Sequence, residues 1–201
     1  IDTGGLLKDP LQLLAEDINR DGMIDLLATG NESDNVVLFI QRADREAFFL
    51  YNLALAEGSG PVALTCGDLS GDSMPDIAVA SMVGISIFEQ AEGDFTETRI
   101  STSGSESSPT GLLAVDFNGN GRLDLLLANA LPPGGIEIFS ERGGAGFTRS
   151  QVISGDNVQT AGGSFLPSAM AQVDLNGDGE KDFVVANRSG DEMTVFWGGR
   201  R

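Results

Sequence analysis

Hydrophobic residues along the chain form short runs that are separated by turn-forming residues, a pattern that favours β-strands over helices. The same order of segments occurs four times: an apolar run, a polar loop, a second apolar run, a turn rich in Gly, Asn, Ser or Pro, and a third run. The first three repeats add a fourth run, at AFFLYNLAL, DFTETRIS and GFTRSQVIS. Each complete repeat therefore predicts a four-stranded antiparallel meander.

The second run of each repeat is apolar at consecutive positions, as in DLLLAN and DFVVAN. A strand of this kind is covered on both faces, whereas strict alternation would predict one solvated face. One meander cannot bury both of its faces, so neighbouring repeats must stack. The predicted fold class is all-β, a β-propeller of four-stranded antiparallel blades with four repeats.

The repeats divide the chain into one propeller domain, residues 1–201, with blades at approximately 9–57, 58–104, 105–160 and 161–201. The last repeat ends after its third run, and two arrangements fit this pattern. In a closed four-bladed ring, residues 1–8 supply the missing outer strand of the last blade. In the second arrangement the chain is part of a larger propeller. Its uncovered blade faces and sheet edges would then pair with another copy of the chain and give a homo-oligomer.

Composition excludes several classes of function. The 201 residues include 30 Asp or Glu and 12 Lys or Arg, a net charge of -18, so the surface would repel nucleic acid. No apolar run reaches the roughly 18 to 20 residues that span a bilayer, so membrane insertion is not expected. Histidine is absent and Cys66 is the single cysteine, which excludes His-based nucleophile activation and His- or thiolate-based metal sites. We expect Cys66 to be a small core residue.

Aspartate is concentrated in the polar loop of each repeat. The loops are DINRDGMID from Asp17, DLSGDSMPD from Asp68, DFNGNGRLD from Asp116 and DLNGDGEKD from Asp174. They begin 51, 48 and 58 residues apart and hold 11 of the 18 aspartates. An ordinary Asp- and Gly-rich turn would explain one such loop, but four copies in register indicate a shared function.

The spacing of the oxygen atoms predicts a hard-cation site. Side-chain oxygens at positions 1, 3, 5 and 9, a carbonyl at position 7 and a tight turn at the Gly of position 6 suit Ca²⁺ better than Mg²⁺. Carboxylates placed this close together repel one another unless a cation lies among them. The predicted ligands, with position 7 acting through its backbone carbonyl, are Asp17, Asn19, Asp21, Met23 and Asp25; Asp68, Ser70, Asp72, Met74 and Asp76; Asp116, Asn118, Asn120, Arg122 and Asp124; and Asp174, Asn176, Asp178, Glu180 and Asp182.

The four loops are not equivalent, and up to four Ca²⁺ ions are expected. Loops 17–25 and 174–182 carry three carboxylates each and rank highest. The third loop has Asn120 in place of an aspartate, and the second has Ser73 where glycine is expected and ranks lowest. An EF-hand is excluded because position 12, which needs a bidentate Glu, is apolar in every repeat: Ala28, Val79, Leu127 and Val185.

These motifs resemble the FG-GAP and VCBS repeats of integrin-type propellers and of many secreted bacterial proteins. The loops DINRDGMID and DLNGDGEKD match the family's DxNxDGxxD motif in full, and the pieces GDFTE and AGFTR look like its entry into the outer strand. The resemblance implies loops that bind Ca²⁺ and a propeller that serves adhesion or ligand binding, usually outside the cell.

The predicted function is a non-catalytic, calcium-binding module, extracellular or periplasmic, whose turns on one rim bind a protein or carbohydrate ligand. We expect no enzyme activity, because most of the clustered carboxylates belong to the repeats and Glu137, Glu141, Asp156 and Asp191 are interpreted as solvated surface charges. Two alternatives remain: the propeller domain of a polysaccharide-active enzyme, a lyase or hydrolase, and a self-assembling structural segment.

Overall fold

The computed structural model describes residues 1–44, 46–91, 93–100, 108–130, 134–143, 146–154, 165–179, 181–188 and 192–198. The chain divides into two compact units, Ile1–Ser103 and Gly104–Arg201. Every regular element among the described residues is a β-strand. Within the same residues no helical segment has the length and apolar character that a membrane crossing requires.

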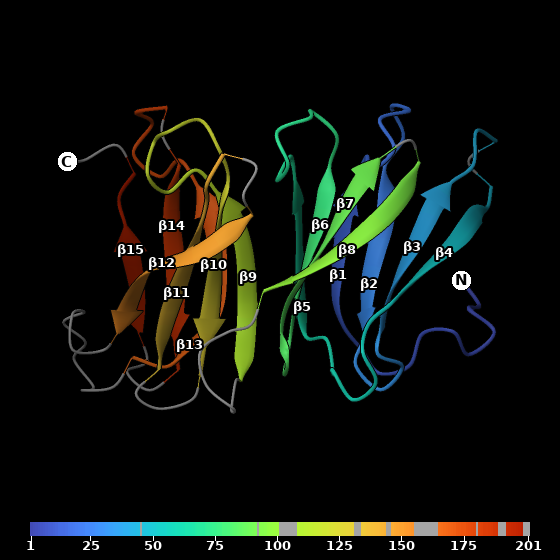
Figure 1. Ribbon diagram of the computed structural model, residues 1–201, viewed down its shortest axis with the longest axis horizontal. Helices are drawn as coiled ribbons and strands as arrows, with labels where there is room; N and C mark the ends of the chain where they lie inside the picture. The colour runs from blue at the N-terminus through green and yellow to red at the C-terminus, as the bar shows by residue number, and fades with distance from the viewer. Residues whose placement is uncertain are drawn as a thin grey trace. The chain divides into compact units, whose positions relative to one another are not determined.

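The first unit holds two four-stranded antiparallel sheets, each with its strands in chain order (Figure 1). Blade 1 consists of β1 (Pro10–Glu16), β2 (Asp25–Gly30), β3 (Asn35–Gln41) and β4 (Phe48–Ala54). Blade 2 consists of β5 (Ala63–Gly67), β6 (Asp76–Ser81), β7 (Gly84–Ala91) and β8 (Asp94–Ile100).

The second unit repeats this architecture. Blade 3 consists of β9 (Pro109–Val115), β10 (Asp124–Asn129), β11 (Gly135–Glu141) and β12 (Phe147–Ser154). Blade 4 has three strands among the described residues, β13 (Pro167–Val173), β14 (Asp182–Asn187) and β15 (Glu192–Phe196). The predicted all-β propeller class of antiparallel blades is confirmed, and the predicted fourth runs are the strands β4, β8 and β12.

The core of each unit lies between its two blades. In the first unit Leu27, Val36 and Leu38 of blade 1 pack on Leu64, Ile77 and Val79 of blade 2. In the second unit Leu126, Ile136 and Ile138 of blade 3 pack on Phe183 and Val185 of blade 4. Cys66 also packs against the first of these cores, as predicted, and burial raises the pKa of its thiol.

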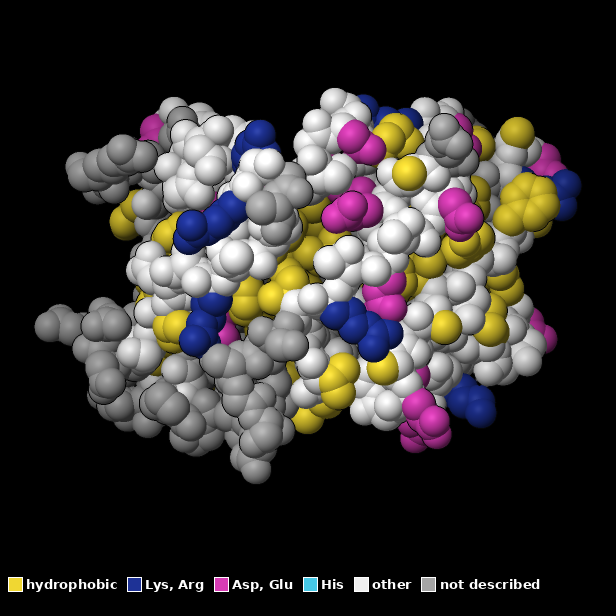
Figure 2. Space-filling model, viewed as in Figure 1, with side chains coloured by type: hydrophobic (Ala, Val, Ile, Leu, Met, Phe, Trp, Pro, Cys, Tyr) yellow, Lys and Arg dark blue, Asp and Glu magenta, His cyan; other side chains and the backbone are white. Residues whose placement is uncertain are grey.

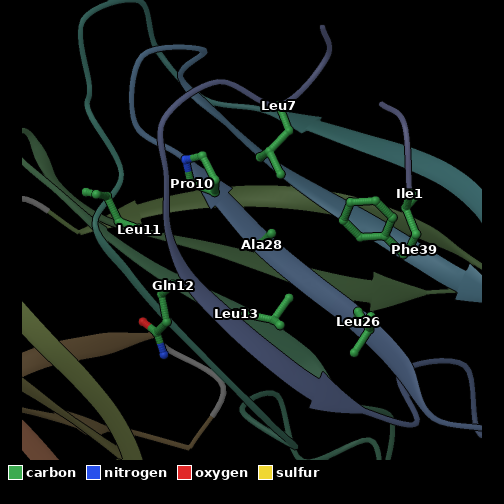
Figure 3. Close-up of a pocket in the computed structure, with 9 residues that line it drawn as sticks. All are labelled: Ile1, Leu7, Pro10, Leu11, Gln12, Leu13, Leu26, Ala28 and Phe39. Atoms are coloured by element: carbon green, nitrogen blue, oxygen red, sulfur yellow. The ribbon is translucent and has the colours of Figure 1, made fainter. Parts of the chain in front are cut away.

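The N-terminal segment lies against the other face of blade 1. Residues 1–9 form no strand, and Leu6 and Leu7 pack on a small core of Ala28, Val37 and Phe39. The side-chain amide of Asn35 donates to the carbonyl of Leu6 over 2.9 Å and fixes the segment. The alternative in which residues 1–8 supply the outer strand of blade 4 is not what the structure has, because these residues form no strand and pack on blade 1 (Figure 3).

Candidate functional site

The acidic loops join the first strand of each blade to its second strand, at residues 17–24, 68–75, 116–123 and 174–181. Within each unit, the two loops lie at the same end of the blades (Figure 1). Each loop ends at an aspartate that is the first residue of the second strand: Asp25, Asp76, Asp124 and Asp182.

The aspartate at position 1 closes its own loop. In the first loop the backbone N–H groups of Asp21 and Gly22 donate to the two carboxylate oxygens of Asp17, at 3.0 and 2.9 Å. The carboxylate at position 1 also accepts backbone N–H groups in the other three loops. Asp68 accepts from Gly71 and Ser73, and Asp174 accepts from Gly177 and Gly179. Asp116 accepts from Gly119, Asn120 and Gly121.

Each loop turns at two residues with left-handed backbone angles, at positions 4 and 6. Position 6 was predicted, and three of the four loops have glycine there, whereas Ser73 adopts φ 74° without being glycine. Position 4 was not predicted: Arg20 has φ 57°, and the three other loops place Gly71, Gly119 and Gly177 at this position. Glycine at position 4 in three of four repeats was the available signal.

The side chains at positions 3 and 5 are exposed or half-buried, and several of them bond within the loop. The backbone N–H of Met23 donates to Asp21 Oδ1 over 2.9 Å, and the amide of Asn19 donates to Asp21 Oδ2 over 3.0 Å. The fourth loop shows the same amide-to-carboxylate bond, from Asn176 to Asp178 over 2.8 Å. In the second and third loops, the backbone N–H groups of Met74 and Arg122 donate to the side-chain oxygens of Asp72 and Asn120, as that of Met23 does to Asp21.

The aspartate at position 9 is buried in every copy, and in the first two blades it ties the loop to the third strand. In blade 2, Asp76 Oδ2 accepts the backbone N–H groups of Leu69 and Ser70, at 2.9 and 2.8 Å, and Oδ1 accepts that of Gln90 at 2.9 Å. Asp25 bridges Ile18 and Gln41, and Asp182 bridges Leu175 and Gly198. Asp124 accepts from Phe117 and from the side-chain amide of Asn118.

Burial raises the pKa of Asp25, and the carboxylates of Asp21 and Asp17 raise it further against the opposing effect of two backbone hydrogen bonds. Burial also raises the pKa of Asp124, to which the charge of Asp116 contributes. The first and third loops therefore bring together carboxylates whose negative charges repel one another. A bound cation would offset this repulsion.

The donor set fits a hard cation in its chemistry, because every side chain that the loops offer at positions 1, 3, 5 and 9 is an oxygen donor. Among the described residues, no group of three or more His, Cys, Asp or Glu side chains is arranged to hold a metal ion, and the loops are closed by hydrogen bonds instead. The ligands assigned above stay predictions, and Glu180 lies outside the described residues.

Glu137 and Glu141 differ from their predicted role as solvated charges. Both are buried on β11 and are paired: Arg149 donates to Glu137 over 3.1 Å, and Arg122 donates to Glu141 over 2.7 Å. The physical reason is that β11 is a middle strand of its sheet, between β10 and β12. Asp156 and Asp191 lie outside the described residues.

Solved structures with the same fold include proteins of different activities. A putative 6-phosphogluconolactonase from Bacteroides uniformis matches with a TM-score of 0.66 and 16% identity, over 90% of this chain and 48% of its own. A periplasmic gluconolactonase from Pseudomonas aeruginosa matches with a TM-score of 0.58 and 17% identity, over 90% of this chain and 48% of its own. BBS1N, solved in complex with ARL6DN, matches with a TM-score of 0.60 and 16% identity, over 96% of this chain and 58% of its own. The chain thus spans about half the length of these proteins.

These matches correct one prediction. The expectation that the chain is not an enzyme is overturned as an inference from this architecture, because the same fold occurs in propellers named as lactonases, which match the chain along most of its length. The expectation rested on the assignment of most clustered carboxylates to the repeats and of the remaining acidic residues to the solvated surface, which does not exclude hydrolases as a class. At these identities the likeness itself shows the fold alone.

The sequence itself identifies the family. No curated protein sequence matches the chain significantly. A family model described as an FG-GAP-like repeat matches three overlapping segments, residues 17–79, 68–127 and 116–185. Each match begins at position 1 of one acidic loop and ends in the second strand of the next blade. The chain therefore belongs to the FG-GAP-like repeat family.

Proposed function

We propose that this propeller is a calcium-binding domain that binds a protein or carbohydrate ligand in an extracellular or periplasmic setting and contributes to adhesion. The observation that carries the calcium proposal is the fourfold recurrence of surface oxygen donors at positions 1, 3 and 5 above a buried carboxylate at position 9. The ligand proposal rests on the family resemblance and on the turns that each repeat adds at the ends of its blades.

Calcium has a structural role in this proposal. Asp17, Asn19 and Asp21 would hold it in the first loop, and Asp174, Asn176 and Asp178 in the fourth. Bound calcium supplies positive charge that offsets carboxylate repulsion. The buried Asp25 couples the first loop to β3 through Gln41, and the buried Asp182 couples the fourth loop to Gly198, which follows β15. At free calcium about 100 times Kd, one site adds roughly 2.7 kcal/mol to the folded state.

Thermal unfolding tests the calcium site. The melting temperature is measured in calcium chloride, in magnesium chloride and in EDTA, for the wild type and for two variants. Asp21→Asn removes one carboxylate but places at position 5 the residue that the third loop has naturally, Asn120. Asp44→Asn, outside the loops, removes the same charge and serves as the matched control.

We expect calcium to raise the melting temperature of the wild type and of Asp44→Asn, and to raise that of Asp21→Asn by less. Magnesium should have a smaller effect. Equal melting temperatures of the wild type in calcium and in EDTA would refute the calcium site, and an equal calcium response of all three proteins would refute its location in the first loop.

Ligand binding is tested separately with defined probes. An array of neutral, sulfated and uronic-acid oligosaccharides and an array of extracellular-matrix proteins are each incubated with the labelled protein, in calcium and in EDTA. We expect saturable binding to members of one probe class that weakens in EDTA. The absence of saturable binding to both arrays in calcium would contradict the ligand proposal without affecting the thermal test.

A second candidate, hydrolase activity, is favoured by the likeness to propellers named as gluconolactonases. The substrates to test are gluconolactone, its 6-phosphate and a panel of acidic and neutral polysaccharides. Acid release in a pH-stat and the appearance of reducing ends report the two kinds of hydrolysis. Rates above the buffer blank that scale with protein concentration would support this candidate, and rates equal to the blank on every substrate would eliminate it for these substrates.

A further inference from the structure

The sequence contains three Asn-Gly pairs, and all of them lie in the acidic loops: Asn118-Gly119 and Asn120-Gly121 in the third loop and Asn176-Gly177 in the fourth. In such a pair the backbone nitrogen of glycine can attack the side-chain amide carbon of asparagine, because glycine has no Cβ to obstruct the approach. At Gly121 the space where a Cβ would stand is open. The surroundings of each asparagine in the folded loop therefore decide which pair reacts.

The attacking nitrogen is held in the same way in all three pairs. The N–H groups of Gly119 and Gly121 donate to the two carboxylate oxygens of Asp116, at 2.8 and 2.7 Å. The N–H of Gly177 donates to Asp174 Oδ1 over 2.7 Å. In each case a carboxylate contacts the proton that the nitrogen must lose, so these contacts give no reason for one pair to react faster than another.

The leaving group distinguishes Asn120 from the other two asparagines. The amide nitrogen of Asn118 donates to Asp124 Oδ2 over 2.9 Å, and that of Asn176 donates to Asp178 Oδ2 over 2.8 Å. Asn120 is exposed and bonds through its backbone N–H and its Oδ1, and its amide nitrogen has no partner among the described residues. This nitrogen can therefore leave as ammonia without breaking a hydrogen bond to the fold.

The side-chain carbonyl of Asn120 is already turned towards the backbone that attacks it. Its Oδ1 accepts the N–H of Arg122 over 2.8 Å, which closes an Asx turn over the peptide of Gly121. The turn brings the side-chain amide to the side of the chain where the Gly121 nitrogen lies. The hydrogen bond also polarises the carbonyl that is attacked.

We propose that Asn120 is a site of spontaneous deamidation and that its aspartyl product completes the carboxylate set of the third loop. The Gly121 nitrogen bonds to Asn120 Cγ and loses its proton, the bond from Cγ to the amide nitrogen breaks, and ammonia and a cyclic succinimide form. Water then opens the ring at one of its two carbonyl groups. One opening gives aspartate, and the other gives iso-aspartate, in which the backbone runs through the side chain. The net reaction consumes water and replaces the amide NH2 by OH.

The other three loops show that an aspartate fits this position. Position 5 is Asp21, Asp72 and Asp178 in them. The carboxylates of Asp21 and Asp72 accept the backbone N–H two residues further along, as the side chain of Asn120 does. The aspartyl product thus turns DFNGNGRLD into a full match of the motif DxNxDGxxD. The gain in calcium affinity that we expect from the added carboxylate rests on the calcium role of the loops proposed above.

Peptide mapping of the full chain by mass spectrometry tests the deamidation site. The protein is incubated at neutral pH in EDTA, folded and in urea, and electron-transfer fragmentation locates the changed residue and separates aspartate from iso-aspartate. In urea the three pairs should react at similar rates. In the folded protein Asn120 should react about fivefold faster than Asn118 or Asn176, because each of those would lose a hydrogen bond. A rate at Asn120 no higher than at these two internal controls would overturn the proposal.

Two variants test the effect on calcium binding. Asn120→Asp supplies the product at once, and Asn120→Gln keeps an uncharged amide whose longer side chain closes the corresponding ring far more slowly. We expect calcium to raise the melting temperature of Asn120→Asp by more than that of the wild type or of Asn120→Gln. Equal calcium responses of the two variants would refute the completed carboxylate set. The absence of a calcium response in all three proteins would instead refute the proposed calcium role, and the deamidation rates would still decide the site.

Discussion

The side-chain amide of Gln12 on β1 forms two hydrogen bonds with the backbone of Leu64 on β5, and it thereby joins the first strands of two blades. Gln12 Nε2 donates to the carbonyl of Leu64 over 3.1 Å, and the N–H of Leu64 donates to Gln12 Oε1 over 2.8 Å. The pairing of β1 with β2 is irregular between Pro10 and Leu13, and the backbone N–H of Gln12 donates to the hydroxyl of Thr29 instead.

Replacing Gln12 by alanine should destabilise the first unit by about 1 to 3 kcal/mol, because both backbone groups of the buried Leu64 lose their partners. The measurement is urea denaturation followed by circular dichroism. Gln151→Ala, an exposed glutamine on the outer strand β12, is the control and should change stability by less than about 0.5 kcal/mol. Equal effects of the two substitutions would show that the inter-blade pair contributes nothing measurable.

The buried carboxylate at position 9 should be required for the fold even without calcium. Asp76→Asn keeps the size of the side chain but replaces one of the two acceptor oxygens by a donor NH2 group, so either the N–H groups of Leu69 and Ser70 or that of Gln90 lose their acceptor. In EDTA we expect a loss of about 2 to 4 kcal/mol in the free energy of unfolding. Asp72→Asn, on the surface of the same loop, should have little effect there, and a similar loss in both would argue against the special role of position 9.

Ser73 adopts a backbone angle that favours glycine, so Ser73→Gly should stabilise the second blade. The angle φ is 74°, and a side chain in this region costs about 1 kcal/mol. Gly121→Ser provides the reciprocal test, because Gly121 has φ 80° at the same loop position with open space around it. In urea denaturation, the midpoint concentration should rise for Ser73→Gly and fall for Gly121→Ser. A shift of both midpoints in the same direction would contradict this account.

Asp34 gives the protein a pH-dependent contribution to stability. Backbone hydrogen bonds from Gly60 and Gly58 hold the pKa of its carboxyl below its usual value of 3.8. A carboxyl group whose pKa is lower in the folded state than in the unfolded state stabilises the fold at pH values above the unfolded-state pKa. This contribution is lost as the pH falls through the folded-state pKa. Asp34→Asn should therefore be less stable than the wild type at pH 7, with a difference that shrinks below pH 3.8 in denaturation curves. A difference that is constant with pH would exclude the charge as its source.

The strands could be predicted from the sequence because their signals are local. Apolar runs and turn residues lie within each repeat, and the predicted fourth runs are β4, β8 and β12. The role of Asp25 could not be read in this way, since Gln41, one of its partners, lies 16 residues along the chain and meets it only through strand pairing. Burial of Glu137 likewise depends on the strands at both sides of β11.

The net charge, which can be counted from the sequence, does not show how charged and apolar side chains are distributed over the surface. On the face in Figure 2, Lys and Arg side chains of the described residues lie in small separate groups among Asp and Glu. The prediction that no nucleic acid binds, which rests on the net charge of -18, stays a prediction. The apolar residues that remain uncovered, such as Leu13 and Met193, could not be recognised from sequence, because their counterparts in other blades are buried.

Because equivalent positions form the contact between the two blades inside each unit, we expect a blade of this chain to act as an interchangeable module. A duplicated repeat would bring both of its blade faces with it, so its insertion would restore the very contacts that it interrupts. Tandem duplication or deletion of a whole repeat is thus the change in length that this packing tolerates best, whereas a partial repeat would leave a mismatched pair of faces.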